Sequence, residues 1–458
     1  MNKIFLIRHS ISIGNEKNII QGDMDYDISE IGKKLLEKLN CENLKHVHKI
    51  YSSPYLRAIR TSKYIKRKIN FRKEIIIDND LIEKNAGILN GKSKEYLRKN
   101  LNNYLQIYLK RGDYDEIPFG EPWKFTQARV ISFLEKYIDN HDEQDVIVSH
   151  AAFMRCFINT INYEFRNKKL DLPNLCIYEI DNPLKNIKFN KYVIAKTAQV
   201  YKVSTYDNNY VLKKSSKKIS QKDYEINKLL HYLSKNIAVP IPIYMTDKQN
   251  YSIKIFDYLE GKHLLGKLSE KDTRNLINEV SRLSELLSNY KTDEFKYKDI
   301  ISHMFCIKEE INNYKYEAIL NKLIDDKELN NYLVNAKYIL VHNDLHRYNI
   351  IFEGEKISFL DFDGIEVGPE ALQLASFIAT SFIIEDVKIN IEDVIRIWNK
   401  NMNKEFNDSL IYKLIIYRLI CGINFFNNIK EPNIDDEKLK KKYISGLERM
   451  FEYEKYCS

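Results

Sequence analysis

The chain has 458 residues, of which 72 are Lys or Arg and 64 are Asp or Glu, giving a formal net charge of +8 at pH 7. This length exceeds one ordinary domain and predicts two or three domains with sizeable hydrophobic cores. The small basic excess forms no long basic run, and the 32 tyrosines and 21 phenylalanines mostly stand at core spacing, so composition argues against a nucleic-acid partner.

The cysteines and the apolar runs indicate the compartment. Six cysteines lie far apart, without a C-x-x-C pair, which argues against a zinc site or a disulfide framework and fits a reducing cytosol. The first apolar run is too short for a signal peptide, and no segment is expected to span a bilayer. We therefore expect a cytoplasmic protein with no membrane partner, and its oligomeric state stays open.

The first part of the chain alternates short apolar runs with helical patterns. Helical patterns are expected within 27–39, with Ser29 as the N-cap, then after Ser53 and Pro54, and at 123–138. Strands that alternate with helices predict an α/β domain with a parallel sheet, which binds ligands beyond the carboxyl ends of its strands. The predicted strands are the apolar runs at 4–7, 47–51, 75–77, 146–148 and 175–180.

Charged side chains stand at the ends of these strands. Arg8 and His9 follow the first strand, Arg57 lies in the helix after the second, and His150 follows a later one. An arginine fork matches phosphate oxygens, and a neutral imidazole can attack phosphorus to give a covalent intermediate. A carboxylic acid must then protonate the departing oxygen, and Glu83, in the loop after the third run, is the candidate.

Four segments together resemble the histidine phosphatase superfamily, the phosphoglycerate-mutase-like group. They are LIRHS, SSPYLRAIRT, LIEKNAGILNG and VSHAAFMR, within a domain expected over residues 1–183. The resemblance implies a three-layer α/β fold, catalysis by His9 as nucleophile with Glu83 as proton donor, and no cofactor. It also implies phosphate contacts from Arg8, Asn15, Arg57 and His150.

This part departs from the family in two positions. Ser10 and Ala151 stand where the family usually has glycine, and the added bulk next to the pocket is expected to change substrate size or rate. The domain also lacks the extra length typical of the mutases, which favours net hydrolysis over phosphate transfer between substrate positions.

A polar stretch at 184–191 is the predicted linker to a second domain at 192–458. Its small lobe, about 192–258, is predicted from apolar runs at 192–195, 200–204, 210–213, 239–244 and 253–259, a turn at 205–209 and a helix at 222–233. Its helical lobe, about 259–458, is predicted from helical patterns at 271–290, 306–336 and 409–428.

The stretch YILVHNDLHRYNIIFEGEKISFLDFDG, residues 338–364, carries the chemistry of this second part. Two predicted strands place Asp344, Asn349 and Asp361 at neighbouring turns. Phosphoryl transfer from a nucleotide needs a carboxylate to orient the attacking hydroxyl, and an amide and a carboxylate as oxygen ligands for magnesium. The pattern resembles the aminoglycoside phosphotransferase and choline kinase family, relatives of the protein kinases.

That resemblance implies a bilobal α+β protein-kinase-like domain that uses ATP and Mg²⁺. Asp344 would align an acceptor hydroxyl, while Asn349 and Asp361 would bind the metal. Lys213 would contact the nucleotide phosphates and pair with Glu225 of the following helix. The acceptor would be a small alcohol such as a sugar, an amino alcohol or an aminoglycoside-like compound.

Three departures bear on this second activity. The loop AKTAQVYKV, residues 195–203, has no glycine where the family's phosphate loop usually has one or two, which puts nucleotide affinity in doubt. Gln373 replaces the usual aspartate, which puts support of the catalytic loop in question. Asn343 replaces the commoner glycine and gives the sequence HNDL, which is similar to that of choline and ethanolamine kinases. This departure slightly favours an amino-alcohol acceptor.

The sequence thus predicts a bifunctional phosphatase and kinase acting on small-molecule phosphoester and alcohol substrates. The alternative is an active histidine phosphatase whose degenerate kinase-like domain serves as a ligand-binding or regulatory module. The substrates are not identified by the sequence. Whether the two activities oppose each other on one metabolite or act in sequence also stays open.

Overall fold

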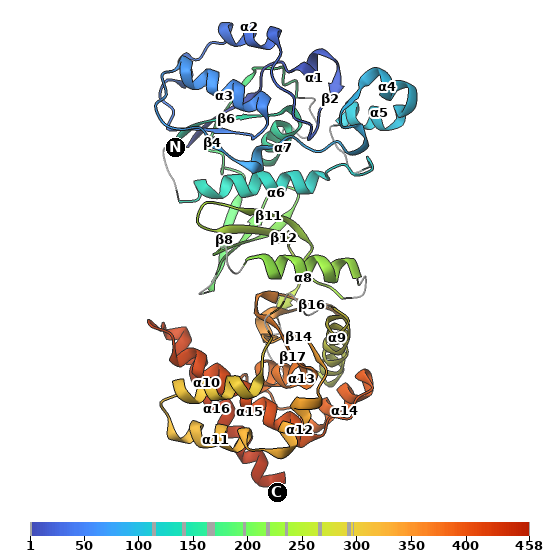
Figure 1. The fold of residues 1–458 in the computed structure, drawn as a ribbon, viewed down its shortest axis with the longest axis vertical. Helices are drawn as coiled ribbons and strands as arrows, with labels where there is room; N and C mark the ends of the chain where they lie inside the picture. The colour runs from blue at the N-terminus through green and yellow to red at the C-terminus, as the bar shows by residue number, and fades with distance from the viewer. Residues whose placement is uncertain are drawn as a thin grey trace. The chain divides into compact units, whose positions relative to one another are not determined.

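The computed structural model describes residues 2–111, 116–139, 143–162, 170–195, 198–216, 220–233, 237–263, 268–290, 295 and 297–457. They form two compact units (Figure 1). Unit 1 comprises residues 1–218 and 242–258, and unit 2 comprises residues 219–241 and 259–458. The domain boundaries expected at 183 and 192 stay a prediction.

The first sheet of unit 1 has the strand order β4-β3-β6-β1-β7. Its four parallel strands are β1 (Lys3–Arg8), β3 (Lys49–Ser52), β4 (Ile76–Ile77) and β6 (Gln144–Ser149). These four strands confirm four of the predicted runs. The fifth strand, β7 (Ile177–Asp181), is antiparallel to β1, so the predicted parallel sheet has one antiparallel strand at its edge.

The direction of β7 follows from where the chain enters it. The amide of Leu175 donates to the carbonyl of Arg8 at 3.1 Å, so the chain reaches β7 at the carboxyl edge of the sheet. A strand that starts at the carboxyl edge of its neighbours must run against them. This return also brings residues 172–176 to the edge that carries the predicted site.

Both faces of this sheet are covered, which explains the continuous apolar runs. Along β1, Ile4 and Leu6 pack into one core together with α6 (Trp123–Leu134) and α7 (Ala151–Ile161). Phe5 and Ile7 pack into the other core, with α3 (Leu56–Lys68). The predicted three-layer α/β architecture is confirmed (Figure 1).

The predicted helix starts were partly right. Ser29 caps α2 (Glu30–Lys38), because its hydroxyl accepts the amide of Gly32 at 3.1 Å. The expected cap at Ser53 was wrong: α3 begins at Leu56 after Tyr55. The Ser53 amide instead donates to the carbonyl of Val148 at 3.0 Å and so continues strand pairing.

A second, antiparallel sheet in unit 1 has the order β11-β12-β10-β9-β8. Its core is continuous with that of α6 and α7, since Tyr210, Leu212 and Ile255 join the same cluster as Phe133. The sheet confirms the predicted strands, and β8 already begins within the predicted linker. The strands are β8 (Lys188–Ala195), β9 (Ala198–Ser204), β10 (Asn209–Ser215), β11 (Pro242–Asp247) and β12 (Ser252–Asp257).

Unit 2 is mostly helical, with two small sheets of order β13-β15-β16 and β14-β17. Its strands are β13 (Lys262–His263), β14 (Tyr338–His342), β15 (Ile350–Glu353), β16 (Lys356–Phe359) and β17 (Ile365–Pro369). Its helices are α8 (Ser220–Leu233), α9 (Glu270–Ser288), α10 (Ile300–Glu310), α11 (Tyr314–Ile324), α12 (Lys327–Asn335), α13 (Glu370–Ile378), α14 (Ile391–Met402), α15 (Asp408–Asn427) and α16 (Ile434–Cys457).

The helical patterns predicted at 271–290 and 409–428 correspond to α9 and α15. The pattern at 306–336 corresponds to the end of α10 and to α11 and α12. Asn313 and Asp326 each accept backbone amides of the helix that follows, so each starts a new helix within the pattern.

The expectation that no segment is long enough to span a bilayer needs correction for α15. Within the described residues, this helix has the length and apolar composition of a membrane span. However, 78% of its most apolar window is buried inside unit 2, and Leu414, Tyr417 and Ile420 lie in its core. Such burial is what a central core helix shows, because core helices are apolar all round.

Candidate functional site

The carboxyl edge of the first sheet brings the two predicted histidines together. His9 follows β1, and its amide donates to the carbonyl of Ser149 at 3.0 Å. His150 is the residue before α7, and the centroids of the two imidazole rings lie 5.1 Å apart. Both side chains and that of Arg57 are buried. Three residues far apart in sequence thus meet at one edge, as the strand order predicts.

The hydrogen bond of His9 defines which of its nitrogens carries the lone pair. Nδ1 lies 2.6 Å from the carbonyl oxygen of Ser10. A carbonyl only accepts, so Nδ1 carries the hydrogen and Nε2 keeps the lone pair. Burial, followed by the charges of Arg57 and Arg8, holds the pKa of His9 well below its ordinary value. His9 is therefore a neutral imidazole with a nucleophilic Nε2.

His150 has the opposite tautomer. Arg57 donates from Nε to Nδ1 of His150 at 3.2 Å, so Nδ1 accepts and Nε2 carries the hydrogen. Nε2 lies 2.8 Å from the hydroxyl of Ser53. Burial, followed by the charges of Arg57 and His9, lowers the pKa of His150 well below its ordinary value. His150 is therefore a neutral hydrogen-bond donor beside His9.

The two arginines are held by backbone carbonyls. Arg57 donates to the carbonyls of Met24 at 2.7 Å and Gly22 at 3.2 Å, and Arg8 donates to the carbonyl of Leu172 at 2.6 Å. Burial lowers the pKa of both guanidinium groups, and the negative charge of Glu83 opposes that shift. Within the described part of the chain, Nε of Arg8 is buried and has no hydrogen-bond partner. An unpaired buried donor beside His9 is a position for a ligand oxygen.

Glu83 lies at the amino end of α7. Its carboxylate accepts the amides of Phe153 at 3.0 Å and Ala152 at 3.4 Å, and also the amide of Lys84 at 2.9 Å. Because its charge acts on both arginines, Glu83 belongs to the same site as the histidines. Glu83 therefore lies near both arginines, and its role as proton donor stays a prediction.

Asn15 reaches the site through a neighbour that the sequence did not single out. Its Oδ1 accepts the amide of Ser12 at 3.1 Å in a capping box and the side-chain amide of Asn174 at 3.4 Å. Asn174 also donates to the carbonyl of His9 at 2.9 Å. No local pattern marks Asn174, because 165 residues separate it from His9.

Ser10, one of the two departures from glycine, packs toward α2. Its buried hydroxyl donates to the carbonyl of Gly32 at 2.8 Å. A Cβ at Gly32 would lie 2.1 Å from the carbonyl oxygen of Ile11, so only glycine allows this close approach of α2. The other departure, Ala151, is the first residue of α7.

A second cluster of predicted residues lies in unit 2, after β14. Asn349 donates from its side-chain amide to the carbonyl of Asp344 at 2.8 Å. The carbonyl of Asn349 in turn accepts the amide of Leu360 at 2.9 Å, directly before Asp361. Asp361 itself has a left-handed backbone with φ of 60°. The structure thus brings Asp344, Asn349 and Asp361 into one cluster.

His342 ties the two loops of this cluster together. Its Nε2 lies 3.0 Å from the carbonyl of Leu360, and its Nδ1 accepts the amide of Asp344 at 3.3 Å. The imidazole is buried, and burial lowers its pKa below the ordinary value. A neutral ring with hydrogen on Nε2 satisfies both contacts.

Helices α13 and α15 support the loop that carries Asp344. Gln373 of α13 accepts the amide of His342 through Oε1 at 2.8 Å. Arg418 of α15 donates from Nη2 at 3.0 Å and from Nε at 3.3 Å to the carbonyl of Asn343. The structure therefore gives Gln373 the supporting contact that its departure from aspartate put in question. Arg418 carried no signal in the sequence, since it sits inside a long apolar helix.

The cluster offers hard oxygen ligands for a divalent cation. Among the described residues, no group of three or more His, Cys, Asp and Glu side chains could hold a metal ion. The amide of Asn349 and the carboxylate of Asp361 supply two oxygen donors, the chemistry that Mg²⁺ selects. These two side chains fit a divalent cation such as Mg²⁺ and would supply part of its oxygen ligands.

The other predicted nucleotide contacts divide between the units. Lys213 is a buried residue of β10 in unit 1, and Glu225 is an exposed residue of α8 in unit 2. Their pairing stays a prediction. Within the glycine-free loop, Lys196 and Thr197 lie outside the described residues.

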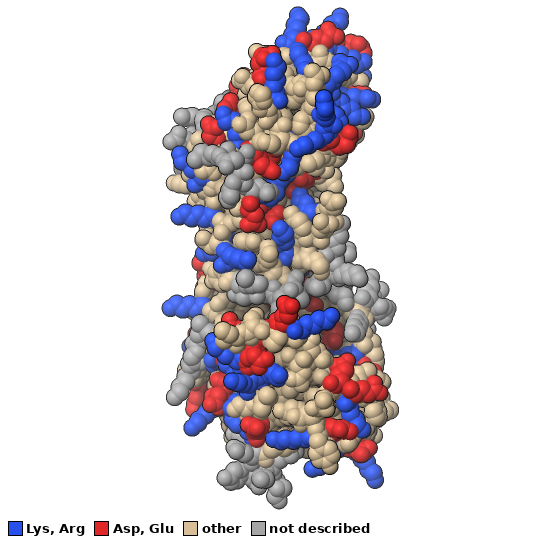
Figure 2. Space-filling model, turned by 90° about the vertical axis from the view of Figure 1, so that its left-hand side faces the viewer, with Lys and Arg blue, Asp and Glu red and all other residues tan. Residues whose placement is uncertain are grey.

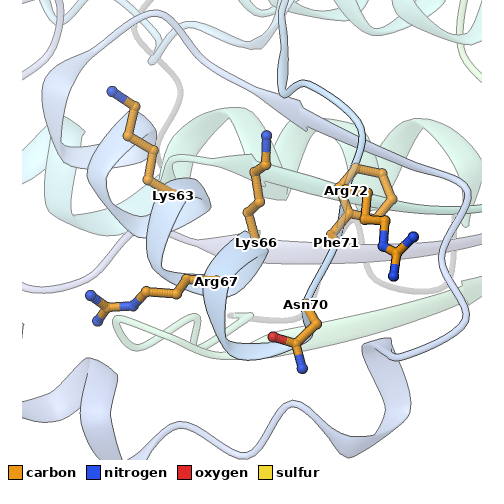
Figure 3. A pocket seen from close by; sticks show the side chains of 6 residues that line it. All are labelled: Lys63, Lys66, Arg67, Asn70, Phe71 and Arg72. Carbon is orange, nitrogen blue, oxygen red and sulfur yellow. The ribbon is translucent and has the colours of Figure 1, made fainter.

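A shallow basic groove of about 660 Å³ lies at the far end of α3 (Figure 3). Arg67, which lines this groove, follows Arg57 by ten positions in α3. The two residues are therefore about 15 Å apart along the helix axis. Figure 2 shows Lys and Arg side chains gathered near the top of that face, with Asp and Glu among them. Cations at a helix C-terminus favour the helix dipole, so a structural role accounts for them. The groove is lined by Lys63, Lys66, Arg67, Asn70, Phe71 and Arg72.

Models of two protein families match the chain, one in each part. A model of the histidine phosphatase superfamily, branch 1, matches residues 4–193, and a model of the phosphotransferase enzyme family matches residues 195–397. The putative phosphoserine phosphatase 2 of Hydrogenobacter thermophilus is 30% identical over 159 residues, 34% of this chain and 77% of that protein. Phosphoserine phosphatase 1 of the same organism is 32% identical over 157 residues, 34% of this chain and 74% of that protein.

Among solved structures, the chain is similar to the amicoumacin kinase hAmiN in complex with AMP-PNP, Ca²⁺ and Ami. The two are 15% identical, with a TM-score of 0.43, over 58% of this chain and 88% of the kinase.

Proposed function

Because residues 4–193 belong to the histidine phosphatase superfamily and residues 195–397 match a model of the phosphotransferase enzyme family, we propose that the chain is a bifunctional phosphatase and kinase. The first region hydrolyses a small phosphomonoester through a phosphohistidine. The second transfers the γ-phosphoryl group of ATP to the hydroxyl of a small molecule. We propose that both reactions occur in the cytoplasm, without a nucleic-acid or membrane partner.

In the proposed hydrolysis, Nε2 of His9 attacks phosphorus while the bond to the leaving alcohol breaks. Arg8, Arg57 and Nε2–H of His150 bind the phosphoryl oxygens, with Asn15 as a further contact. Glu83 gives its proton to the leaving oxygen. Water then attacks the phosphohistidine, the Glu83 carboxylate takes the proton from that water, and phosphate and neutral His9 are released.

The single observation that carries this proposal is the adjacent position of Arg8 and His9 at the carboxyl end of β1. His9 is a neutral imidazole whose lone pair is on Nε2, since Nδ1 is bound to the Ser10 carbonyl. Nε of Arg8 is a buried donor with no hydrogen-bond partner among the described residues. A nucleophile beside an unpaired cationic donor suits a phosphoryl group, which brings both an electrophile and an oxygen acceptor.

The relatives suggest a substrate class. Two proteins at 30% and 32% identity are named phosphoserine phosphatases. We propose a small phosphomonoester of an aliphatic alcohol, with phosphoserine as the first compound to measure. An aliphatic alkoxide is a poor leaving group, so its departure requires the proton that Glu83 supplies.

In the proposed phosphotransfer, the Asp344 carboxylate orients the acceptor hydroxyl and takes its proton as the oxygen attacks the γ-phosphorus. Asn349 and Asp361 would hold Mg²⁺, which neutralises charge on the phosphate oxygens when bound. Lys213 would bind nucleotide phosphates and Glu225 would orient Lys213. The acceptor class is a sugar, an amino alcohol or an aminoglycoside-like compound.

A second candidate function keeps the phosphatase and makes the other region a regulatory or ligand-binding module. The observation that favours it is the glycine-free stretch at 195–203, which reduces close backbone approach to phosphates. The contact from Gln373 to the His342 amide argues for the active kinase, because the catalytic loop is braced.

Two variants distinguish a bifunctional enzyme from a phosphatase that carries a regulatory module. Wild type, His9→Ala and Asp344→Ala are assayed for phosphoserine hydrolysis and, with MgATP and a metabolite extract, for a compound that gains about 80 Da by mass spectrometry. Two enzymes predict that each substitution removes one activity and leaves the other. Hydrolysis without phosphotransfer to any compound would support the regulatory module, and hydrolysis retained by His9→Ala would overturn the phosphatase assignment.

A further inference from the structure

Strand β11 and the turn after it contact the loop that leads to Glu83. Tyr244 donates from its hydroxyl to Oδ1 of Asp80 at 2.8 Å. Lys248 donates to Oδ2 of Asp80 at 2.6 Å and to Oδ1 of Asp78 at 3.2 Å. Both donors belong to the region matched by the phosphotransferase family, and both acceptors belong to the histidine phosphatase region. The contact therefore joins the two family regions inside unit 1.

This contact is withdrawn from solvent. The Asp80 side chain is fully buried, and those of Asp78 and Lys248 are 13% and 18% exposed. Burial raises the pKa of Asp80, and the charge of Lys248 opposes that rise. An ion pair shielded in this way is screened little by salt, and loss of one partner leaves a buried charge unpaired.

The opposite side of the same loop is fixed by the phosphatase region. Arg129 donates from Nη1 to the carbonyls of Asp80 and Ile82, at 2.8 Å each, and forms a bidentate pair with Glu121. Ser149 donates to the carbonyl of Leu81 at 2.8 Å. Asp80 is thus held through its backbone by one region and through its side chain by the other, three residues before Glu83.

We propose that Tyr244 and Lys248 are positioning residues for the phosphatase reaction. They hold Asp80 so that the chain delivers the Glu83 carboxyl to the leaving-group oxygen. The inference rests on the proposed function in taking Glu83 as the proton donor. The histidine phosphatase region is then incomplete without residues 242–248, although these lie beyond the family match at 4–193.

The same interface offers matched controls. Lys214 pairs with Glu135 at 2.6 Å, and Tyr251 donates to Glu135 at 2.8 Å. These contacts also join the second sheet to the phosphatase region, with the same residue types. Glu135 follows α6 and is not part of the loop before Glu83. A purely structural role predicts the same kinetic outcome for both pairs of contacts.

The test uses the full chain and two substrates that differ in leaving group. Phosphoserine releases an aliphatic alkoxide and needs a general acid, whereas 4-nitrophenyl phosphate releases a stabilised phenolate and does not. The quantity compared is kcat/KM, which reports the steps up to release of the alcohol. The variants are Lys248→Met and Tyr244→Phe, with Lys214→Met and Tyr251→Phe as controls and Lys248→Arg as the conservative change.

For Lys248→Met we expect kcat/KM on phosphoserine to fall about tenfold or more. This loss lies within the contribution of general acid catalysis, which is roughly 10²–10⁴-fold. On 4-nitrophenyl phosphate we expect kcat/KM to fall about twofold or less. Tyr244→Phe should change the ratio in the same direction to a smaller degree, and Lys248→Arg should restore it. The controls should leave the ratio at the wild-type value even where they lower the melting temperature.

Equal losses on both substrates, or no loss on either, would overturn the inference. If Lys248→Met does not fold, Tyr244→Phe decides alone, because it removes one hydrogen bond without unpairing a buried charge. The proposed function fails by a different result: wild type hydrolyses neither compound, or His9→Ala remains as active as wild type.

Discussion

Gln373 accepts the backbone amide of His342 through its side-chain oxygen at 2.8 Å. His342 in turn bridges the loops that carry Asp344 and Asp361. A glutamine can supply this acceptor as well as an aspartate can, since only one oxygen is needed. Its own amide nitrogen has no hydrogen-bond partner in the part of the chain that the structure describes, and the structure leaves this part of the substitution unexplained.

Gln373→Leu should therefore impair unit 2 and its chemistry. The substitution leaves the His342 amide buried without an acceptor, at a cost of about 1–3 kcal/mol in the free energy of unfolding. Phosphotransfer should fall at the same time, because the loop carrying Asp344 loses a support. Denaturant unfolding and a coupled ATP assay measure the two effects.

Thr380→Val is the matched control for that substitution. Its buried hydroxyl donates to the carbonyl of Ser376, one turn earlier in the chain, at 2.8 Å. Equal losses of phosphotransfer in both variants would contradict a specific role for Gln373.

The two histidines of the phosphatase site could be predicted because they follow parallel strands. β1 and β6 are hydrogen-bonded parallel neighbours. This pairing alone brings together the residues that follow the carboxyl ends of the two strands. The start of α3 could not be predicted in this way. Ser53 has the residue type of a cap, but its hydroxyl contacts His150, a partner 97 positions away in the chain.

The residues that sequence reasoning missed share this property. Asn174 contacts His9 across 165 positions, and Arg418 contacts Asn343 across 75 positions. Neither lies in a local pattern that distinguishes it from other polar residues. Arg418 occupies a helix whose remaining pattern is that of a buried core element. Such contacts depend on how elements pack, which periodicity and spacing do not encode.

Hydrolysis should persist as the pH falls below the ordinary pKa of histidine. The pKa of His9 lies well below 6.5, because of burial and then the charges of Arg57 and Arg8. Protonation would remove the lone pair from Nε2, so this loss of activity should occur only below pH 6.5. The acid limb of the kcat/KM profile for phosphoserine measures it.

Arg57→Gln removes one of the charges that lower this pKa. The acid limb should therefore move to higher pH, toward 6.5, although burial retains part of the shift. The measurement compares the pH at which the acid limb falls and not the maximal value of kcat/KM. The maximal value is also expected to change, because Arg57 contacts the phosphoryl group in the proposed reaction. An acid limb that stays in place would contradict the assigned electrostatic role.

Arg8→Lys should lower kcat/KM for phosphoserine by about 10- to 100-fold while keeping the positive charge. The unpaired buried Nε of Arg8 and its planar fork are lost, and a lysine offers a single point charge instead. Steady-state kinetics should show most of the change in KM. Arg60→Lys is the control, because Arg60 is 51% exposed and pairs with Asp27 at 3.4 Å, away from the histidines. A similar loss in both variants would argue against phosphate binding by Arg8.

Removal of divalent metal should separate the two activities of the chain. Addition of EDTA should abolish phosphotransfer and leave phosphoserine hydrolysis unchanged, because the proposed hydrolysis uses only side chains.

Asp361→Asn should raise the Mg²⁺ concentration for half-maximal phosphotransfer by about tenfold, since an amide is a weaker ligand than a carboxylate. Asparagine also tolerates the left-handed backbone at this position, so the turn is kept. Glu353→Gln, an exposed carboxylate paired with Lys356 at 3.7 Å, should leave the Mg²⁺ requirement at the wild-type value. A requirement that is the same in all three proteins would remove Asp361 from the metal site.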